Sequence, residues 1–176
     1  SIAQSLWHRH VSTEAAASSF GQPGVRRVVI KPQVGANAVD TFVLEERVGQ
    51  DRLTRLAATF EGRPFFIQPF MENVQTEGEY SLFYFDLECS HAILKIPAAG
   101  DFRSQEEHGA EIRSVDAPPA LLVAGERIMS LVEPPPVYAR ADFVRGADDR
   151  FLLMELELIE PSLYLRTDPG SAARFA

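Results

Sequence analysis

Two glutamates alternate with apolar residues near the end of the chain, in the stretch 151–162 (Phe-Leu-Leu-Met-Glu-Leu-Glu-Leu-Ile-Glu-Pro-Ser). A repeat of two is typical of a β-strand, so Glu155 and Glu157 are expected to point to the same face. Two neighbouring carboxylates are costly to bury unless a positive charge lies between them, and a divalent metal ion is the usual partner. An exposed edge strand with a solvated acidic face is the alternative. The residues expected to face a core are Met154, Leu156 and Leu158.

A second predicted strand, 137–145, precedes this one and is joined to it by a four-residue turn, which indicates a β-hairpin. In the register that is symmetric about this turn, Arg140 lies across from Glu155 and Asp142 across from Leu153. A slip of one residue would move Asp142 to the opposite face. If the symmetric register holds, three carboxylates and one guanidinium converge, which fits a Mg²⁺ site that also faces phosphate oxygens. The charged residues of this face are Arg140, Asp142, Glu155 and Glu157.

The remaining elements follow from the pattern of the rest of the chain. Residues 1–20 indicate one or two helical turns and a connection, and 72–78 a polar connection. The polar segment 97–114 lacks an apolar repeat, which favours a mobile active-site loop. The order of elements indicates an α+β fold with a largely antiparallel sheet. The predicted elements are strands 25–31, 41–44 and 64–70, a helix over 53–60, a hairpin of 79–87 and 90–96 that turns at Glu88 and Cys89, a helix from Pro118, the final hairpin and a short closing helix.

Composition limits the classes of protein to which the chain can belong. Its 176 residues fit one domain or two small subdomains, and the 45% of hydrophobic residues suffice for a core. A net charge of -8 argues against a nucleic-acid or anionic-membrane surface. The lone cysteine, Cys89, excludes an internal disulfide and suits the cytoplasm. No apolar run approaches the roughly 20 residues that cross a bilayer, and the first residues do not form a secretory signal.

Lysine is used at only two positions, Lys31 and Lys95, whereas the other basic residues among the 17 are arginines. Lysine differs from arginine in carrying a compact ammonium on a flexible stem. Its retention at two positions suggests that such a group is needed there.

The order and spacing of these motifs resemble the C-terminal portion of the ATP-grasp ligases, from about residue 25 to about residue 175. The similarity is to the glutathione-synthetase-like group, which includes the cyclo-ligase of cycloserine biosynthesis. It rests on Val-Val-Ile-Lys-Pro ending at Pro32, Gly-Glu-Tyr at 78–80, Arg-Ala-Asp-Phe at 140–143 and Glu-Leu-Glu at 155–157. The resemblance implies an ATP-grasp fold, in which two subdomains grip ATP between them. These would be a small subdomain, 1–70, incomplete at its N-terminus, and a large one, 71–176.

The resemblance also assigns nucleotide contacts. It places Lys31 at the α- and β-phosphates, and Gln68 and Phe70 in the hinge strand beside the adenine, although Phe70 is equally well explained as a core residue. Glu79 would bind the ribose hydroxyls, with Glu77 as the rival for that position.

Catalytic and metal-binding roles are implied by the same likeness. Lys95 and Arg140 would face the active site, and Arg103 would reach the γ-phosphate or the acyl phosphate from a flexible loop. Two Mg²⁺ ions would be held by the acidic residues, although many family members have asparagine at the position of Glu157. The implied metal ligands are Asp142, Glu155 and Glu157.

The implied activity is ATP- and Mg²⁺-dependent ligation of a carboxylate to an amine through an acyl phosphate, on small amino-acid-type substrates in the cytoplasm. No nucleic acid or membrane partner is expected, and a homo-oligomer is compatible with the sequence. The N-terminal substrate domain of the family is not found, so the chain is expected to be a fragment. The alternatives are a catalytically inactive ATP-binding regulatory domain and a purely structural domain.

Overall fold

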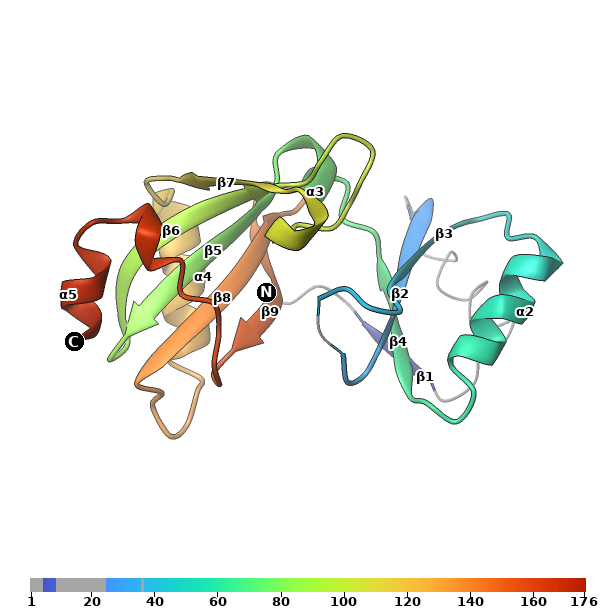
Figure 1. Cartoon of the computed structure of the whole chain (residues 1–176), viewed down its shortest axis with the longest axis horizontal. Coiled ribbons are helices and arrows are strands. Elements are labelled where there is room, and N and C mark those ends of the chain that lie inside the picture. The colour runs from blue at the N-terminus through green and yellow to red at the C-terminus, as the bar shows by residue number, and fades with distance from the viewer. Residues whose placement is uncertain (1–4, 9–24, 36) are drawn as a thin grey trace. The chain divides into compact units, whose positions relative to one another are not determined.

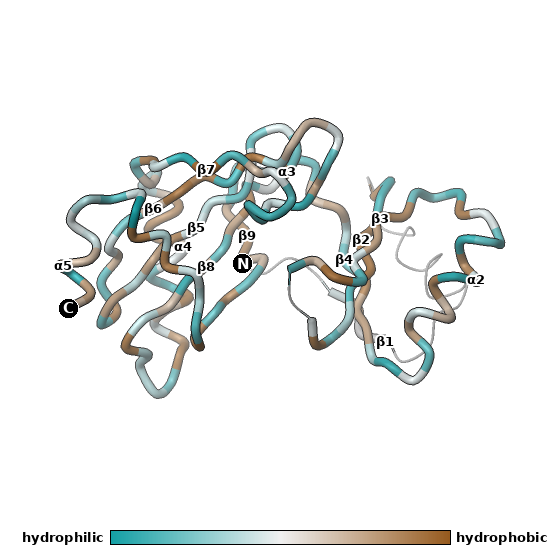
Figure 2. Tube along the Cα trace, viewed as in Figure 1, coloured by the Kyte–Doolittle hydropathy of each residue, from teal (hydrophilic) through white to brown (hydrophobic). Residues whose placement is uncertain are grey.

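The computed structural model describes residues 5–8, 25–35 and 37–176 and divides the chain into two compact units between Phe70 and Met71. Each unit has its own antiparallel sheet, with α2 (Gln50–Thr59) beside the first sheet and several short helices and α4 (Pro119–Met129) beside the second (Figure 1). Hydrophobic and hydrophilic residues both occur along the strands (Figure 2), as expected for strands with one buried face. Within the described residues, no helix is both long enough and apolar enough to cross a membrane.

The unit that ends at Phe70 is a four-stranded sheet in the order β1-β4-β2-β3, in which neighbouring strands are antiparallel. The predicted strands and helix are present with ends shifted by one to three residues. Residues 6–8, for which helical turns were expected, instead form a strand that pairs with β4, and positions 9–20 of that prediction lie outside the described residues. The elements are β1 (Leu6–His8), β2 (Arg27–Pro32), β3 (Phe42–Glu45), α2 (Gln50–Thr59) and β4 (Phe65–Pro69).

The core of this unit forms where α2 packs on the sheet. Leu56 and Phe60 of the predicted helical stripe are 2% and 1% exposed, whereas Ala57 faces solvent, so the buried stripe is narrower than the sequence suggests. Burying a side chain of this size stabilises a fold by about 1.5–3 kcal/mol. The core residues are Val28, Ile30, Leu44, Leu56, Phe60, Phe65 and Ile67.

The second unit is a five-stranded antiparallel sheet in the order β7-β6-β5-β8-β9. The predicted hairpins and the helix that begins after Pro118 are confirmed. The elements are α3 (Asn73–Thr76), β5 (Glu79–Phe85), β6 (Glu88–Ile96), η1 (Glu106–His108), β7 (Glu111–Ser114), α4 (Pro119–Met129), β8 (Tyr138–Arg145), β9 (Phe151–Glu157), η2 (Leu165–Thr167) and α5 (Ser171–Phe175).

Three local predictions in this unit are wrong. The β5–β6 turn lies at Asp86 and Leu87, which have φ of 48° and 70°, rather than at Glu88 and Cys89. Two consecutive residues with positive φ are typical of the tightest hairpin turns. The connection 72–78 contains the short helix α3, and the last part of the predicted loop 97–114 is the edge strand β7. A helix of one turn and a short edge strand each bury few side chains, so their sequences show no apolar repeat.

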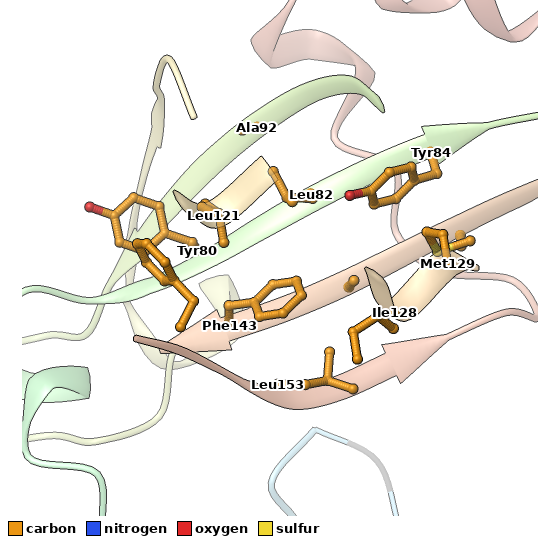
Figure 3. Close-up of a cluster of buried hydrophobic side chains, with 12 residues drawn as sticks. Tyr80, Leu82, Tyr84, Ala92, Leu121, Ile128, Met129, Phe143 and Leu153 are labelled. Atoms are coloured by element: carbon orange, nitrogen blue, oxygen red, sulfur yellow. The ribbon is translucent and has the colours of Figure 1, made fainter. Parts of the chain in front are cut away.

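Helix α4 covers one face of this sheet. Its residues Leu121, Ile128 and Met129 pack against apolar side chains of β5, β8 and β9 (Figure 3). Proline near the first helical position costs no helical hydrogen bond, which explains why the helix begins at Pro119. The charged residues of the predicted site lie on the opposite face of the sheet, so α4 supports the strands that carry them without contacting the site.

Two tyrosines of β5 point into this apolar face but differ in their hydrogen bonds. The Tyr80 hydroxyl donates to Glu77 Oε1 at 2.8 Å, whereas the buried Tyr84 hydroxyl has no hydrogen-bond partner among the described residues. Burial raises the pKa of Tyr84, so its hydroxyl stays neutral. We expect Tyr84→Phe to raise the free energy of unfolding by about 1 kcal/mol, because it removes a desolvated group without a partner.

Tyr80→Phe is the matched control for this change. It should lower the free energy of unfolding by about 1–2 kcal/mol, because it breaks a hydrogen bond to a carboxylate. Urea denaturation of both variants measures the difference. Equal destabilisation by the two changes would contradict the assignment of Tyr84 as unpartnered.

Candidate functional site

The hairpin of β8 and β9 brings charged side chains to the face of the sheet opposite α4, in a register that differs from the prediction. Arg140 pairs with Glu157 rather than Glu155, and Asp142 pairs with Glu155 rather than with Leu153. One residue of this shift arises at the turn, and another at a β-bulge beside Asp142. Because the two shifts add to two residues, the predicted face is retained.

The bulge also changes which residues of β9 face the core. Phe151 and Leu153 are 3% and 8% exposed, on the far side of the bulge from Leu156, which packs partly buried against the same core. Met154, which the prediction placed in the core, lies at the bulge, and Leu158 is 37% exposed. A strict period of two therefore predicts the carboxylate face correctly but the core face only in part.

A chain of ion pairs runs across β5, β6, β8 and β9 on this polar face. The Lys95 ammonium is 3.1 Å from Glu79 Oε1 and 3.0 Å from Asp142 Oδ2. The Arg140 guanidinium lies 3.1 Å from Asp142 Oδ1 and also contacts Glu157. Lys95, Arg140 and Asp142 are 5%, 8% and 1% exposed, so the centre of the chain is desolvated. The sequence predicts all five residues for the site, and the fold brings them together.

The positive and negative charges on this polar face do not balance. Burial would raise the pKa of Asp142, but Lys95 and Arg140 outweigh it and hold the pKa of that carboxyl below its usual value. Burial would lower the pKa of Lys95, and Asp142 and Glu79 instead raise it. The Glu155 side chain keeps contact with solvent, yet the surrounding protein and the carboxylates of Asp142, Glu157 and Glu79 raise its pKa. Burial contributes most to this rise, and the neighbouring carboxylates add a repulsion that a bound cation would relieve.

The predicted metal ligands are therefore near one another but are not assembled. Among the described residues, no three Asp, Glu, His or Cys side chains form a group that could already hold a metal ion. Both oxygens of Asp142 already accept hydrogen bonds from Lys95 or Arg140, and Glu157 contacts Arg140. Glu155 is the candidate ligand whose pKa is raised by burial and by the neighbouring carboxylates. The oxygen-only donor set suits Mg²⁺, so the three carboxylates stay a predicted set.

Glu79 and Glu77, the two candidates for ribose binding, have different surroundings. Glu79 lies directly across from Lys95 on β6 and also accepts a hydrogen bond from the Ser104 hydroxyl at 2.8 Å. Glu77 pairs with Arg145 at 3.0 Å, and Arg145 and Tyr80 lower its pKa although burial opposes this. Glu79 therefore belongs to the polar network, whereas Glu77 belongs to a separate ion pair.

Arg103 lies outside this network. Its guanidinium contacts the Asp101 carboxylate at 2.7 Å, and Asp101 also accepts from the backbone N–H groups of Phe102 and Arg103. Hydrogen bonds from Arg103 hold the pKa of Asp101 well below its usual range. Sequence reasoning missed Asp101 and Ser104, and their place inside the predicted active-site loop was the signal that could have identified them.

The segment after β9 borders the same face. The Arg140 guanidinium donates to the Ser162 carbonyl at 3.4 Å, and His91 Nε2 lies 3.0 Å from the Leu163 carbonyl. The His91 ring is stacked on Phe83 with centroids 4.3 Å apart, and burial lowers its pKa. In the fold, His91 therefore supports the segment after β9.

The other predicted nucleotide contacts lie in the unit that ends at Phe70. Lys31 follows Ile30 on β2, and its ammonium is 5.0 Å from the centre of the Phe66 ring. Gln68 is buried and donates to the Ser5 hydroxyl at 3.0 Å. Phe70 is 8% exposed, and the Arg27 guanidinium lies 4.0 Å from its ring centre. The roles of these residues toward a nucleotide stay predictions.

Similar proteins are known for nearly the whole chain. The cycloserine biosynthesis protein DcsG of Streptomyces lavendulae is 33% identical over 92% of this chain and 58% of its own length. The crystal structure of the D-cycloserine synthetase DcsG matches with a TM-score of 0.75 at 27% identity, over 99% of this chain and 62% of that chain. The chain thus spans little more than half the length of these relatives. No protein-family model matches it.

Two further solved structures share the fold at lower identity. The ATP-grasp ligase PsnB, solved with a precursor variant, Mg and ADP, has a TM-score of 0.63 at 20% identity over 98% of this chain and 48% of that chain. The D-alanine–D-alanine ligase of Bacillus anthracis, solved with ATP, has a TM-score of 0.65 at 18% identity over 98% of this chain and 54% of that chain. The two antiparallel sheets and the similarity to these structures show that the chain has an ATP-grasp fold.

Proposed function

We propose that this chain is the nucleotide-binding part of an ATP- and Mg²⁺-dependent ligase that joins a carboxylate to an amine through an acyl phosphate. The observation that carries the proposal is the set of ion pairs on the face of the five-stranded sheet opposite α4, where four carboxylates lie near two cations. An excess of anionic oxygen beside a buried ammonium and guanidinium suits a metal-bound triphosphate. Its presence in an ATP-grasp fold related to D-cycloserine synthetase supports the same function.

The residues of this face fit Mg²⁺ by their chemistry. Glu155 and Glu157 would supply oxygen ligands, with Asp142 joining if Lys95 or Arg140 turns to a phosphate. When bound, Mg²⁺ would neutralise phosphate charge and hold the triphosphate in place. The number of ions is part of the proposal, and two are expected.

Phosphoryl transfer requires positioning and charge neutralisation more than covalent help from the protein. An acceptor carboxylate attacks the γ-phosphorus, ADP leaves, and an amine then displaces phosphate from the acyl phosphate. Lys95 and Arg140 would neutralise the transferred group because both are desolvated cations that lie beside Asp142 on this face. Arg103 would have to leave Asp101 to take part.

Nucleotide contacts would complete this arrangement. Lys31 would bind phosphate oxygens, and Gln68 and Phe70 would border the adenine. Glu79 would accept the ribose hydroxyls. The acid and amine are proposed to be small amino-acid-type molecules, and the reaction is placed in the cytoplasm.

Isothermal titration with a non-hydrolysable ATP analogue, with and without Mg²⁺, tests the proposal. We expect Glu155→Gln/Glu157→Gln to weaken Mg²⁺-dependent binding at least tenfold, because both changes remove anionic oxygen ligands. Glu111→Gln/Glu126→Gln removes two exposed carboxylates from the same unit and should leave binding unchanged. Absence of nucleotide binding by the wild-type protein would refute the proposal.

Single-turnover release of ADP with amino-acid mixtures then separates a ligase from an inactive nucleotide-binding domain. Release that depends on added acid and amine is the expected result. Binding of the analogue without any ADP release would favour the regulatory domain instead.

A further inference from the structure

One hydroxyl from the segment 97–110 reaches into the polar network. Ser104 is 5% exposed, and its hydroxyl donates to Glu79 Oε1 at 2.8 Å. The same oxygen accepts from the Lys95 ammonium at 3.1 Å. Among the described residues, no hydrogen bond to the second oxygen, Oε2, accompanies these two. The carboxylate is therefore held at one oxygen and keeps acceptor capacity at the other.

The stretch that carries Ser104 is fastened to the same unit on both sides. Gln75 donates to the Asp101 carbonyl at 2.9 Å, and Arg166 contacts Glu106 at 2.6 Å. Both of these contacts involve exposed side chains, and exposed contacts stabilise weakly. Ser104 makes the buried contact between them, so its hydrogen bond to a charged group is expected to contribute more than either.

We propose that Ser104 is a positioning residue for Glu79, which couples the segment 97–110 to an occupied nucleotide site. The proposal rests on the proposed function, in which Glu79 accepts nucleotide hydroxyls. Two donors on Oε1 hold the carboxylate in one rotamer and leave Oε2 for the ligand. Because a coupling free energy is reciprocal, a nucleotide that engages Glu79 also stabilises Ser104 and its segment on the sheet.

Trypsin provides a direct measure of this coupling, because it cleaves after Arg103, at the bond that joins Arg103 to Ser104. We expect the ATP analogue with Mg²⁺ to slow this cleavage at least threefold in the wild-type protein. In Ser104→Ala, cleavage without nucleotide should be faster, the nucleotide should protect less, and the analogue should bind about threefold to tenfold more weakly. Cleavage after Arg113, in strand β7, is the internal reference.

Three variants separate positioning from a general loss of structure. Ser114→Ala removes an exposed hydroxyl from β7 and should behave as wild type. Ser104→Thr keeps a hydroxyl and should therefore keep the nucleotide protection and the affinity that Ser104→Ala loses. Glu79→Gln should lose protection as Ser104→Ala does, and the double change should add little, because both act through one hydrogen bond.

Several results would overturn the inference. Wild-type affinity and protection in Ser104→Ala would show that the hydrogen bond does not position Glu79, and tighter binding would show that Ser104 competes with the nucleotide. If the wild-type protein binds no nucleotide, the proposed function fails and the inference falls with it. The cleavage rates without nucleotide would still show whether Ser104 holds the segment on the sheet, which separates the two failures.

Discussion

Lys95→Met should lower the free energy of unfolding by about 3–5 kcal/mol, the cost of leaving a buried charge without its partner. Lys95 is the only cation that contacts both Glu79 and Asp142 within the described residues. Asp142 is 1% exposed, so water cannot replace the ammonium, and Arg140 alone would have to compensate two carboxylates. Methionine keeps much of the length of lysine, so the change removes charge more than volume.

Arg113→Met is the matched control for this prediction. Arg113 and its partner Glu111 are 55% and 60% exposed on β7, where an ion pair contributes about 0–1 kcal/mol. Urea denaturation of the two variants should therefore differ by several kcal/mol. A loss below about 1 kcal/mol for Lys95→Met would mean that the network does not depend on its ammonium.

Gly125→Ala is expected to destabilise the protein by about 2–3 kcal/mol, although alanine is the better helix former. A Cβ atom at Gly125 would lie 2.0 Å from the Tyr84 hydroxyl and 2.6 Å from Leu82 Cδ1. Both neighbours are fully buried beneath α4, so neither can move without disturbing the core. The helix would have to lift from the sheet, and the strain exceeds the roughly 1 kcal/mol gain in helix propensity.

Tyr84→Phe provides the test of this mechanism. Removing the hydroxyl eliminates the 2.0 Å contact and leaves the ring carbon Cζ at 3.2 Å as the nearest tyrosine atom. Gly125→Ala should therefore cost at least 1 kcal/mol less in the Tyr84→Phe background than in the wild type. Thermal or urea unfolding of the four proteins completes the cycle. An equal cost in both backgrounds would place the strain elsewhere.

Much of the fold could be predicted from local patterns. The alternation in β5, β8 and β9 and the apolar stripe with its leading prolines in α4 identify elements that bury one face. The edge strand β7 and the short helix α3 could not be found in this way, because they contribute little to the core of their unit. The β5–β6 turn was misplaced because Leu87, at φ 70°, is not a typical residue for a turn with positive φ.

The candidate site shows the same division. Residue types and their order were enough to select Lys95, Arg140 and Asp142. The two-residue alternation of a β-strand was enough to place Glu155 and Glu157 on one face of the sheet. The partners of these residues could not be predicted, because the register depends on a turn and a β-bulge that leave no clear pattern in the sequence. The hydrogen bonds of Ser104 and Asp101 were missed for a related reason, since loop contacts depend on the surfaces against which the loop lies.

The Glu155–Glu157 strand illustrates what each level of structure decides. Its alternating residues predict two carboxylates on one face, because successive side chains of any strand point to opposite sides. The sequence also places an arginine and an aspartate on the preceding strand, and its ordered motifs indicate the ATP-grasp group. Only the tertiary structure shows that Asp142 forms ion pairs with Lys95 and Arg140, whereas burial and the neighbouring carboxylates raise the pKa of Glu155. The reason is that Lys95 and Asp142 are 47 residues apart in the sequence. They meet only because β6 and β8 lie on either side of the same strand, β5, in the sheet.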